Sequence, residues 1–134
     1  MIFYLSLILI IISIFSSVRI LFLPQKVKGN RVYFENFLFF AAVYATVMIG
    51  FGLMYIILEV HGYPVLDDGD KSVGSGFISR LETGLYFSAM TLFSVGYGEI
   101  APIGVGRIIA VSEALIGYTI PAAFVARTVL DLEK

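Results

Sequence analysis

The sequence predicts an all-α membrane protein with three transmembrane helices and one shorter, re-entrant helix that leads into an extended segment. Only 14% of the 134 residues are charged and 59% are hydrophobic, whereas soluble domains usually carry about 25% charged residues. Three apolar stretches each reach the roughly 20 residues that a helix needs to cross a bilayer. A fourth stretch is shorter and more polar, which is typical of a helix that enters the membrane without crossing it.

The composition also excludes several classes of function. The chain has no cysteine, so it holds no disulfide scaffold, no thiolate metal site and no cysteine nucleophile. Its net charge is −1, which gives no basic field for a nucleic-acid partner. A chain this apolar is expected to place most of its surface against the lipid bilayer or against copies of itself.

The first apolar stretch runs from Ile2 to Leu23 and is interrupted only by serines and Arg19. A secretory signal would need a basic start, an apolar run of roughly 7 to 15 residues and a small-residue cleavage site. Here Met1 leads directly into the apolar run, and nothing similar to Ala-x-Ala precedes Pro24. We therefore expect a retained transmembrane helix.

The other stretches follow in order along the chain. The second, Phe37 to Val60, has no charged residue before Glu59, and the third, Ile108 to Leu130, contains Glu113 within it. Each is expected to span the membrane. The stretch Phe77 to Phe93 lies between them and is interrupted by polar residues such as Arg80 and Glu82, so we expect it to be the re-entrant helix.

The orientation follows from the distribution of basic residues. The short loop from Pro24 to Asn36 contains Lys26, Lys28 and Arg31, and it is therefore expected to be cytoplasmic. This places the N-terminus outside and the C-terminus in the cytoplasm of a multi-pass plasma-membrane protein. The acidic segment from His61 to Gly76, with Asp67, Asp68 and Asp70, is then extracellular. His61 itself is expected to be an interfacial residue rather than a ligand.

The most informative motif is Ser94-Val95-Gly96-Tyr97-Gly98. Glycine at alternate positions adopts backbone angles that other residues avoid, so consecutive carbonyls can face one side of the ribbon. Several such ribbons around an axis would form stacked cages of oxygen atoms that replace the water shell of a large alkali cation. The Ser94 hydroxyl would add an innermost ring of ligands.

These glycines have two other interpretations. Gly96-x-Gly98-x-x-Ala101 also fits the dinucleotide-binding pattern, but that pattern needs a helix directly after it in a soluble βαβ unit. Pro102 follows at once, and apolar spans flank both sides. A purely structural glycine-rich turn is the second alternative.

The motif resembles the selectivity filter of tetrameric potassium channels, which is usually Thr-Val-Gly-Tyr-Gly followed by an acid. The resemblance runs from about Phe37 to Val129, and the segment Ala114 to Gly117 resembles the inner helices of two-pore-domain and simple bacterial channels. It implies a homotetramer of this chain, closed around one axis, that conducts K⁺ passively. The implied K⁺ ligands are Ser94, Val95, Gly96 and Tyr97, with Gly98 completing the filter and Glu99 at the outer mouth.

The resemblance divides the chain into an N-terminal helix and loop (1–36) and a pore domain (37–134). Within the pore domain it implies an outer helix (37–60), a turret (61–76), a pore helix (77–93), a filter (94–98) and an inner helix (107–132). No cofactor is implied apart from the permeant K⁺. A regulatory domain or subunit outside this chain remains open.

Gating is expected in the inner helix. At about 100° per residue, one face carries Ala114, Tyr118, Pro121 and Val125, and we predict that this face lines the inner cavity. Gly117 lies at its edge, and Pro121 removes a helix hydrogen bond, so together they predict a bend. Close helix packing is the alternative role for Gly117.

Glu113 is unusual, because an acid inside a transmembrane span is costly and usually functional. Its position on the helix predicts that it points toward the pore helix, where Ser88 and Thr91 offer hydroxyls. There it would support the filter from behind, and a ring of carboxylates in the cavity is the alternative. Tyr86 and Phe87 stand where many relatives have tryptophans that brace the filter, so they are further candidates for filter support.

Several departures from the family pattern leave the function open. Ser94 replaces the usual threonine, and the chain has no tryptophan, so a weakly selective cation channel is an alternative. A non-conducting regulatory membrane subunit is a third hypothesis. The first span contains a single charge, Arg19, rather than the arginine ladder of a voltage sensor. Nothing in the sequence indicates an enzyme, since it holds no recognisable triad, metal cluster or phosphate loop.

Overall fold

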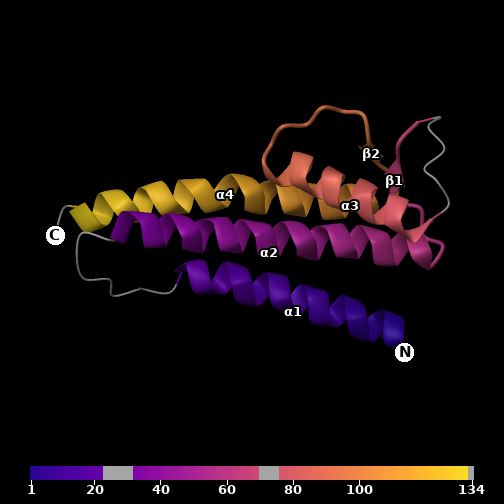
Figure 1. Ribbon diagram of the computed structural model, residues 1–134, viewed down its shortest axis with the longest axis horizontal. Coiled ribbons are helices and arrows are strands. Elements are labelled where there is room, and N and C mark those ends of the chain that lie inside the picture. The colour runs from indigo at the N-terminus through magenta and orange to yellow at the C-terminus, as the bar shows by residue number, and fades with distance from the viewer. Residues whose placement is uncertain (23–31, 70–75, 133–134) are drawn as a thin grey trace.

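The computed structural model describes residues 1–22, 32–69 and 76–132 (Figure 1). In chain order, the elements are α1 (Ile2–Phe22), α2 (Val32–Val60), β1 (Leu66–Asp67), α3 (Phe77–Leu92), β2 (Ala101–Pro102) and α4 (Gly106–Leu132). Within the described residues, three helical segments are long and apolar enough to cross a membrane: Ile2–Ile20, Phe37–Val60 and Gly106–Ala126. The predicted fold class, an all-α membrane protein with a shorter fourth helix, is confirmed.

The three long helices lie side by side, and α3 is the short helix packed across one end of the α2–α4 pair (Figure 1). Helix α3 starts at the end of the molecule that holds the N-terminus and stops partway along α4. The chain then turns back to the end where it started, and α4 runs from there to the C-terminus. This is the re-entrant path that the sequence predicted for residues 77–93.

Helix α1 packs along α2 through a narrow contact. Ile10 and Ile14 are buried there, and the missing side chain of Gly50 admits them, since a Cβ atom at that position would lie 2.7 Å from Ile14 Cγ1. Most of the other large apolar side chains of α1 are exposed. Because lipid tails solvate these side chains, the opposite face of α1 needs no protein partner within the bilayer.

Helices α2 and α3 approach each other at two glycines. A Cβ atom at Gly84 would lie 3.0 Å from the Gly52 carbonyl oxygen and 2.9 Å from Ile56 Cγ1, and one at Gly52 would lie 2.7 Å from Leu85 Cδ2. Small residues at helix contacts are typical of membrane proteins, where close backbone packing rather than the hydrophobic effect drives association. These glycines therefore set how closely the short helix seats against the long one.

The segment after α3 is tied to the segment after α2. β1 and β2 pair antiparallel, with Leu66 opposite Pro102 and Asp67 opposite Ala101, and the Ile103 N–H donates to the Val65 carbonyl at 2.9 Å. The sequence analysis did not predict this pair, because two-residue strands are too short to show an alternating pattern. The pair anchors the far end of the glycine-rich ribbon.

Three predicted boundaries need correction. The outer helix begins at Val32 rather than Phe37, because the helix continues past the N-terminal end of the apolar stretch. Hydropathy indicates only the apolar part of the helix. The inner helix begins at Gly106 and the pore helix ends at Leu92, each one residue from its predicted limit. The basic cluster Lys26, Lys28 and Arg31 lies at residues 23–31, outside the described residues, as does Asp70.

The Gly52–Gly84 contact predicts a steric effect on stability. Gly84→Ala should destabilise the protein by about 1–3 kcal/mol, because its methyl group would meet the Gly52 carbonyl and Ile56 with little room to shift. Gly76→Ala is the matched control: its Cβ atom would meet nothing within 4 Å, so it should cost under about 1 kcal/mol. Thermal unfolding in detergent measures both. Equal losses for the two variants would contradict the close approach.

Candidate functional site

The glycine-rich ribbon begins as the C-terminal cap of α3. The Val95 N–H donates to the Met90 carbonyl at 2.9 Å and the Ser94 N–H donates to the Thr91 carbonyl at 3.1 Å. Phe93 is the C-cap residue of α3, and Ser94 follows it. Ser94 has a φ of 57°, the left-handed angle that this type of helix ending requires at the residue after the C-cap. The direction in which the ribbon leaves the helix is therefore fixed by hydrogen bonds to the last turn of α3.

Positive φ angles recur at alternate residues of the ribbon. Ser94 and Gly96 are both at 57° and Gly98 is at 79°, whereas Val95 and Tyr97 are not in the left-handed region. The side chains of these two intervening residues are 48% and 71% exposed in the single chain. The described ribbon thus has the alternating backbone that the sequence analysis expected of Gly96 and Gly98, with Ser94 as an additional member.

The left-handed angle at Ser94 gives a physical reason for the serine. A β-branched residue at positive φ is a genuine outlier, and a small polar residue tolerates the angle better. Threonine, the usual residue of the related motif, would therefore be strained in this backbone. The sequence does not show this reason, because there the serine is only a departure from the usual Thr-Val-Gly-Tyr-Gly motif.

The end of α3 rests on the middle of α4 at Gly117. A Cβ atom at Gly117 would lie 2.2 Å from the Leu92 carbonyl oxygen, and Leu92 itself is 1% exposed. No side chain fits between these two backbones. Close packing, the alternative weighed for Gly117, thus accounts for a glycine here, and it places the start of the ribbon beside the middle of the inner helix.

Glu113 is fully buried and joins three helices. The Tyr55 hydroxyl of α2 donates to Glu113 Oε2 at 2.8 Å, and the Ser88 hydroxyl of α3 is hydrogen-bonded to Glu113 Oε1. Ser88 Oγ also lies 2.8 Å from the Met48 carbonyl of α2. Glu113, Ser88 and Tyr55 each have 0% exposure. Among the described residues, no buried side-chain nitrogen or oxygen lacks a partner, so the network is complete.

This arrangement bears on the two roles considered for Glu113. Its carboxyl group faces Ser88 on the pore helix, as the helical position predicted, and not the exposed face of α4. Thr91, the other expected hydroxyl partner, instead contributes its backbone carbonyl to the cap of α3. The sequence does not indicate the role of Tyr55. A tyrosine in an apolar span is typical of a lipid or helix contact, and nothing in the pattern indicates a partner 58 residues away.

Two aromatic residues directly precede Ser88 on α3 and differ in their environment. Phe87 is buried and meets the Tyr55 ring edge-on at a centroid distance of 5.2 Å, so it stabilises the Glu113 network. Tyr86 is exposed, and its hydroxyl is 3.4 Å from Glu99 Oε2. Partial desolvation and the Glu99 carboxylate raise the pKa of Tyr86, so the phenol remains a neutral donor to the acid that follows the ribbon.

Three of the four residues predicted to line an inner cavity are exposed in the single chain. Tyr118 is 77% exposed and Val125 is 60% exposed, and Pro121 is exposed as well. Ala114 is half-buried and Gly117 is buried. Much of this face of α4 is thus exposed in the described chain.

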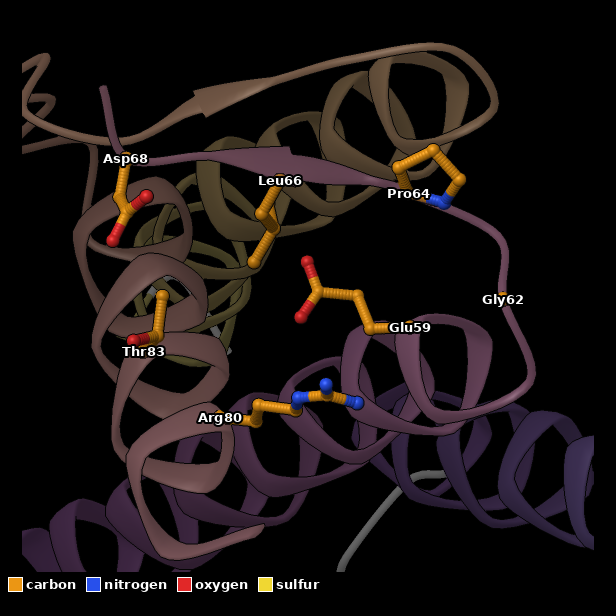
Figure 2. A pocket seen from close by; sticks show the side chains of 7 residues that line it. All are labelled: Glu59, Gly62, Pro64, Leu66, Asp68, Arg80 and Thr83. Carbon is orange, nitrogen blue, oxygen red and sulfur yellow. The ribbon is translucent and has the colours of Figure 1, made fainter. Parts of the chain in front are cut away.

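A polar pocket of about 410 Å³ opens at the end of the molecule where α2 meets α3 (Figure 2). The Glu59 carboxyl group and the Arg80 guanidinium point into the same space beneath β1, and Asp68 and Thr83 lie at its far side. Nearby, His61 contacts the Phe3 ring of α1 at a centroid distance of 4.2 Å. His61 is therefore part of the α1–α2 contact, and its Nδ1 lies 2.8 Å from the Ile57 carbonyl.

Comparison with known proteins identifies the family to which the chain belongs. The family model described as an ion channel matches residues 53–134, which include the last eight residues of α2, all of α3, the ribbon and α4. The chain belongs to this ion channel family, and it is a membrane protein. Helix α1 lies outside the matched segment.

Two curated relatives are both named Protein LctB. The one from Bacillus caldotenax is 51% identical over 88 residues, which are 66% of this chain and 66% of the relative. The one from Geobacillus stearothermophilus is 46% identical over 91 residues, 68% of each chain. The match thus spans about two thirds of the length of these relatives. No solved structure matches the chain significantly.

The buried network predicts how substitutions at Glu113 affect stability. Glu113→Ala should destabilise the protein by about 3–5 kcal/mol, because it leaves a cavity, removes the partner of the buried Tyr55 hydroxyl and removes one of the two partners of the Ser88 hydroxyl. Glu113→Gln keeps the volume and one acceptor oxygen, and its amide nitrogen can donate to the other hydroxyl oxygen, so it should cost less than half as much. Thermal unfolding of the detergent-solubilised protein measures the difference. Equal stabilities of the two variants would show that the carboxyl group lies elsewhere.

The cap geometry predicts a ranking at position 94. Ser94→Gly should keep or slightly raise stability, because glycine adopts a positive φ without cost. Ser94→Thr should lower it, since strain of this kind costs on the order of 1 kcal/mol or more. Thermal unfolding under identical conditions gives the ranking, and a threonine variant more stable than the glycine variant would contradict a left-handed residue at this position.

Proposed function

We propose that the chain is the pore-forming subunit of a potassium-selective channel that conducts K⁺ passively across the cell membrane. The observation that carries the proposal is the ribbon Ser94–Gly98, which has positive φ at alternate residues. The ribbon follows α3, a short helix that stops partway along α4. Alternation between left-handed and ordinary angles turns successive peptide carbonyls toward one side. Such carbonyls can replace the hydration shell of a K⁺ ion.

The proposed K⁺ ligands are the backbone oxygens of Ser94, Val95, Gly96 and Tyr97, with the Ser94 hydroxyl in the innermost ring. One chain supplies one ribbon, and a cage needs ribbons on all sides. We therefore propose a closed homotetramer, in which the exposed ribbons face a common axis. The exposed apolar face of α4, with Tyr118 and Val125, would then line the inner cavity or meet a neighbouring copy.

The surroundings of the ribbon support cation passage. The C-terminal end of α3 carries the negative end of a helix dipole, which favours a cation just beyond it. Glu99 follows the ribbon and lies on the exposed surface beside Asp68 and Glu82, where a cavity of about 340 Å³ is lined by acidic groups. Negative charge at this mouth raises the local concentration of cations.

The proposed orientation places the N-terminus and the Glu99 mouth outside the cell and the C-terminus in the cytoplasm. Its basis is the excess of lysine and arginine between α1 and α2. The α1 N-terminus, the start of α3 and the β1–β2 pair all lie at one end of the molecule (Figure 1), so they would share the outer side. Gating would occur by bending of α4 near Gly117 and Pro121.

One observation favours a second candidate, a weakly selective cation channel. Ser94 lacks the methyl group that fixes a threonine side chain in one rotamer, so the innermost ring of hydroxyls would be less rigid. The two candidates differ only in discrimination between cations and share every other feature of the site.

The proposal predicts the ion flux of the purified chain. Reconstituted in liposomes, it should carry K⁺ and Rb⁺ and exclude Na⁺, and Gly98→Ala should abolish this flux because alanine is strained at a φ of 79°. Gly104→Ala is the matched control, since Gly104 also has a positive φ, 50°, but lies outside the ribbon. It should conduct.

The same assay separates the alternatives. Flux of Na⁺ equal to that of K⁺ would support the weakly selective channel and overturn potassium selectivity. A chain that carries neither ion, although folded and tetrameric by size-exclusion with light scattering, would favour a non-conducting subunit.

A further inference from the structure

The inner helix contains a carbonyl group that loses its usual hydrogen-bond partner. In an α-helix the carbonyl of residue 117 accepts from the N–H of residue 121, but residue 121 is Pro121, which lies inside α4 and has no N–H. The Gly117 carbonyl is thereby left for another donor. An unpaired carbonyl in a helix that crosses lipid is costly, because no water is available to bond it.

The missing donor comes from a different helix. The Tyr44 hydroxyl of α2 donates to the Gly117 carbonyl at 2.8 Å. The same tyrosine ring stacks on Phe93 at a centroid distance of 5.4 Å and an interplanar angle of 7°, and Phe93 is the cap residue from which the ribbon leaves α3. One side chain therefore touches both the point where α4 lacks a bond and the base of the ribbon.

The surroundings of this hydrogen bond keep water away. Tyr44 and Pro121 line a cavity of about 450 Å³ between α2, the end of α3 and α4, and its other lining side chains are apolar. They are Phe37, Phe40, Ala41, Ala45, Met48, Phe93 and Phe124. A hydrogen bond in such a low-dielectric environment is stronger than in water, and breaking it exposes a polar group to an apolar space.

We propose that Tyr44 is a positioning residue for gating: its hydroxyl replaces the hydrogen bond that Pro121 removes, and it latches the inner helix to the outer helix and to the base of the ribbon. This inference rests on the proposed channel function and specifies its regulation. When α4 bends further or straightens at Gly117–Pro121, the carbonyl moves away from Tyr44 and the latch opens. Loss of the latch then changes the balance between conducting and closed states.

A double-mutant cycle tests the latch. Tyr44→Phe keeps the ring but removes the hydroxyl, and Pro121→Ala restores the N–H that can bond the Gly117 carbonyl within α4. In single-channel bilayer recordings, Tyr44→Phe should shift the open–closed equilibrium about three- to tenfold, the effect of one hydrogen bond of ordinary strength. In the Pro121→Ala background the same change should have an effect under about twofold. The sign of the shift identifies the latched state.

A control variant and two contrary outcomes make the test of the latch decisive. Tyr4→Phe removes the same hydroxyl from α1, where Tyr4 is 67% exposed, and should leave the equilibrium unchanged. Equal shifts by Tyr44→Phe in both backgrounds, or no shift in either, would overturn the latch while leaving the channel proposal intact. A wild-type chain that is folded and tetrameric but silent would overturn the proposed function, and the gating role of Tyr44 with it.

Discussion

The buried hydrogen bonds of Glu113 hold the short helix in place. A polar side chain surrounded by apolar helices and lipid must find its partners within the protein, because water is absent. Glu113 finds them on both neighbouring helices, through Tyr55 on α2 and Ser88 on α3. An apolar contact would tolerate sliding and rotation, whereas these directional bonds are satisfied in one arrangement. The position of α3, and of everything that follows it, depends on them.

Glycines complete the placement that the hydrogen bonds begin. Gly84 lets α3 lie against the backbone of α2, and Gly117 lets its last carbonyl touch α4. With both sides fixed, the end of α3 has one location, and the cap at Ser94 then sends the chain back toward the end where α3 began. The backbone angles of the ribbon are thus the continuation of a helix end that is held from two directions.

The single chain is internally satisfied yet incomplete as a surface. Among the described residues, every buried side-chain nitrogen and oxygen atom has a hydrogen-bond partner, so these atoms need no further protein contact. The side chains of the ribbon and of α4 differ, because many of them are exposed in the single chain. They lie on the elements that would have to surround an ion path across the membrane. This division explains how one chain can fold stably while its function, as proposed, needs copies of itself.

The sequence by itself determined the number, order and approximate limits of the helices, since hydropathy and helix length follow from local composition. It also determined that Gly96 and Gly98 permit an unusual ribbon, and that Glu113 faces the pore helix, because helical periodicity fixes direction. Only the tertiary structure decided which groups meet: Tyr55 with Glu113, Tyr44 with Gly117, and β1 with β2. These pairs join residues far apart in the chain, and a tyrosine in an apolar span carries no local sign of its partner. The left-handed angle of Ser94 was likewise set by the helix end that precedes it, which no count of residue types could show.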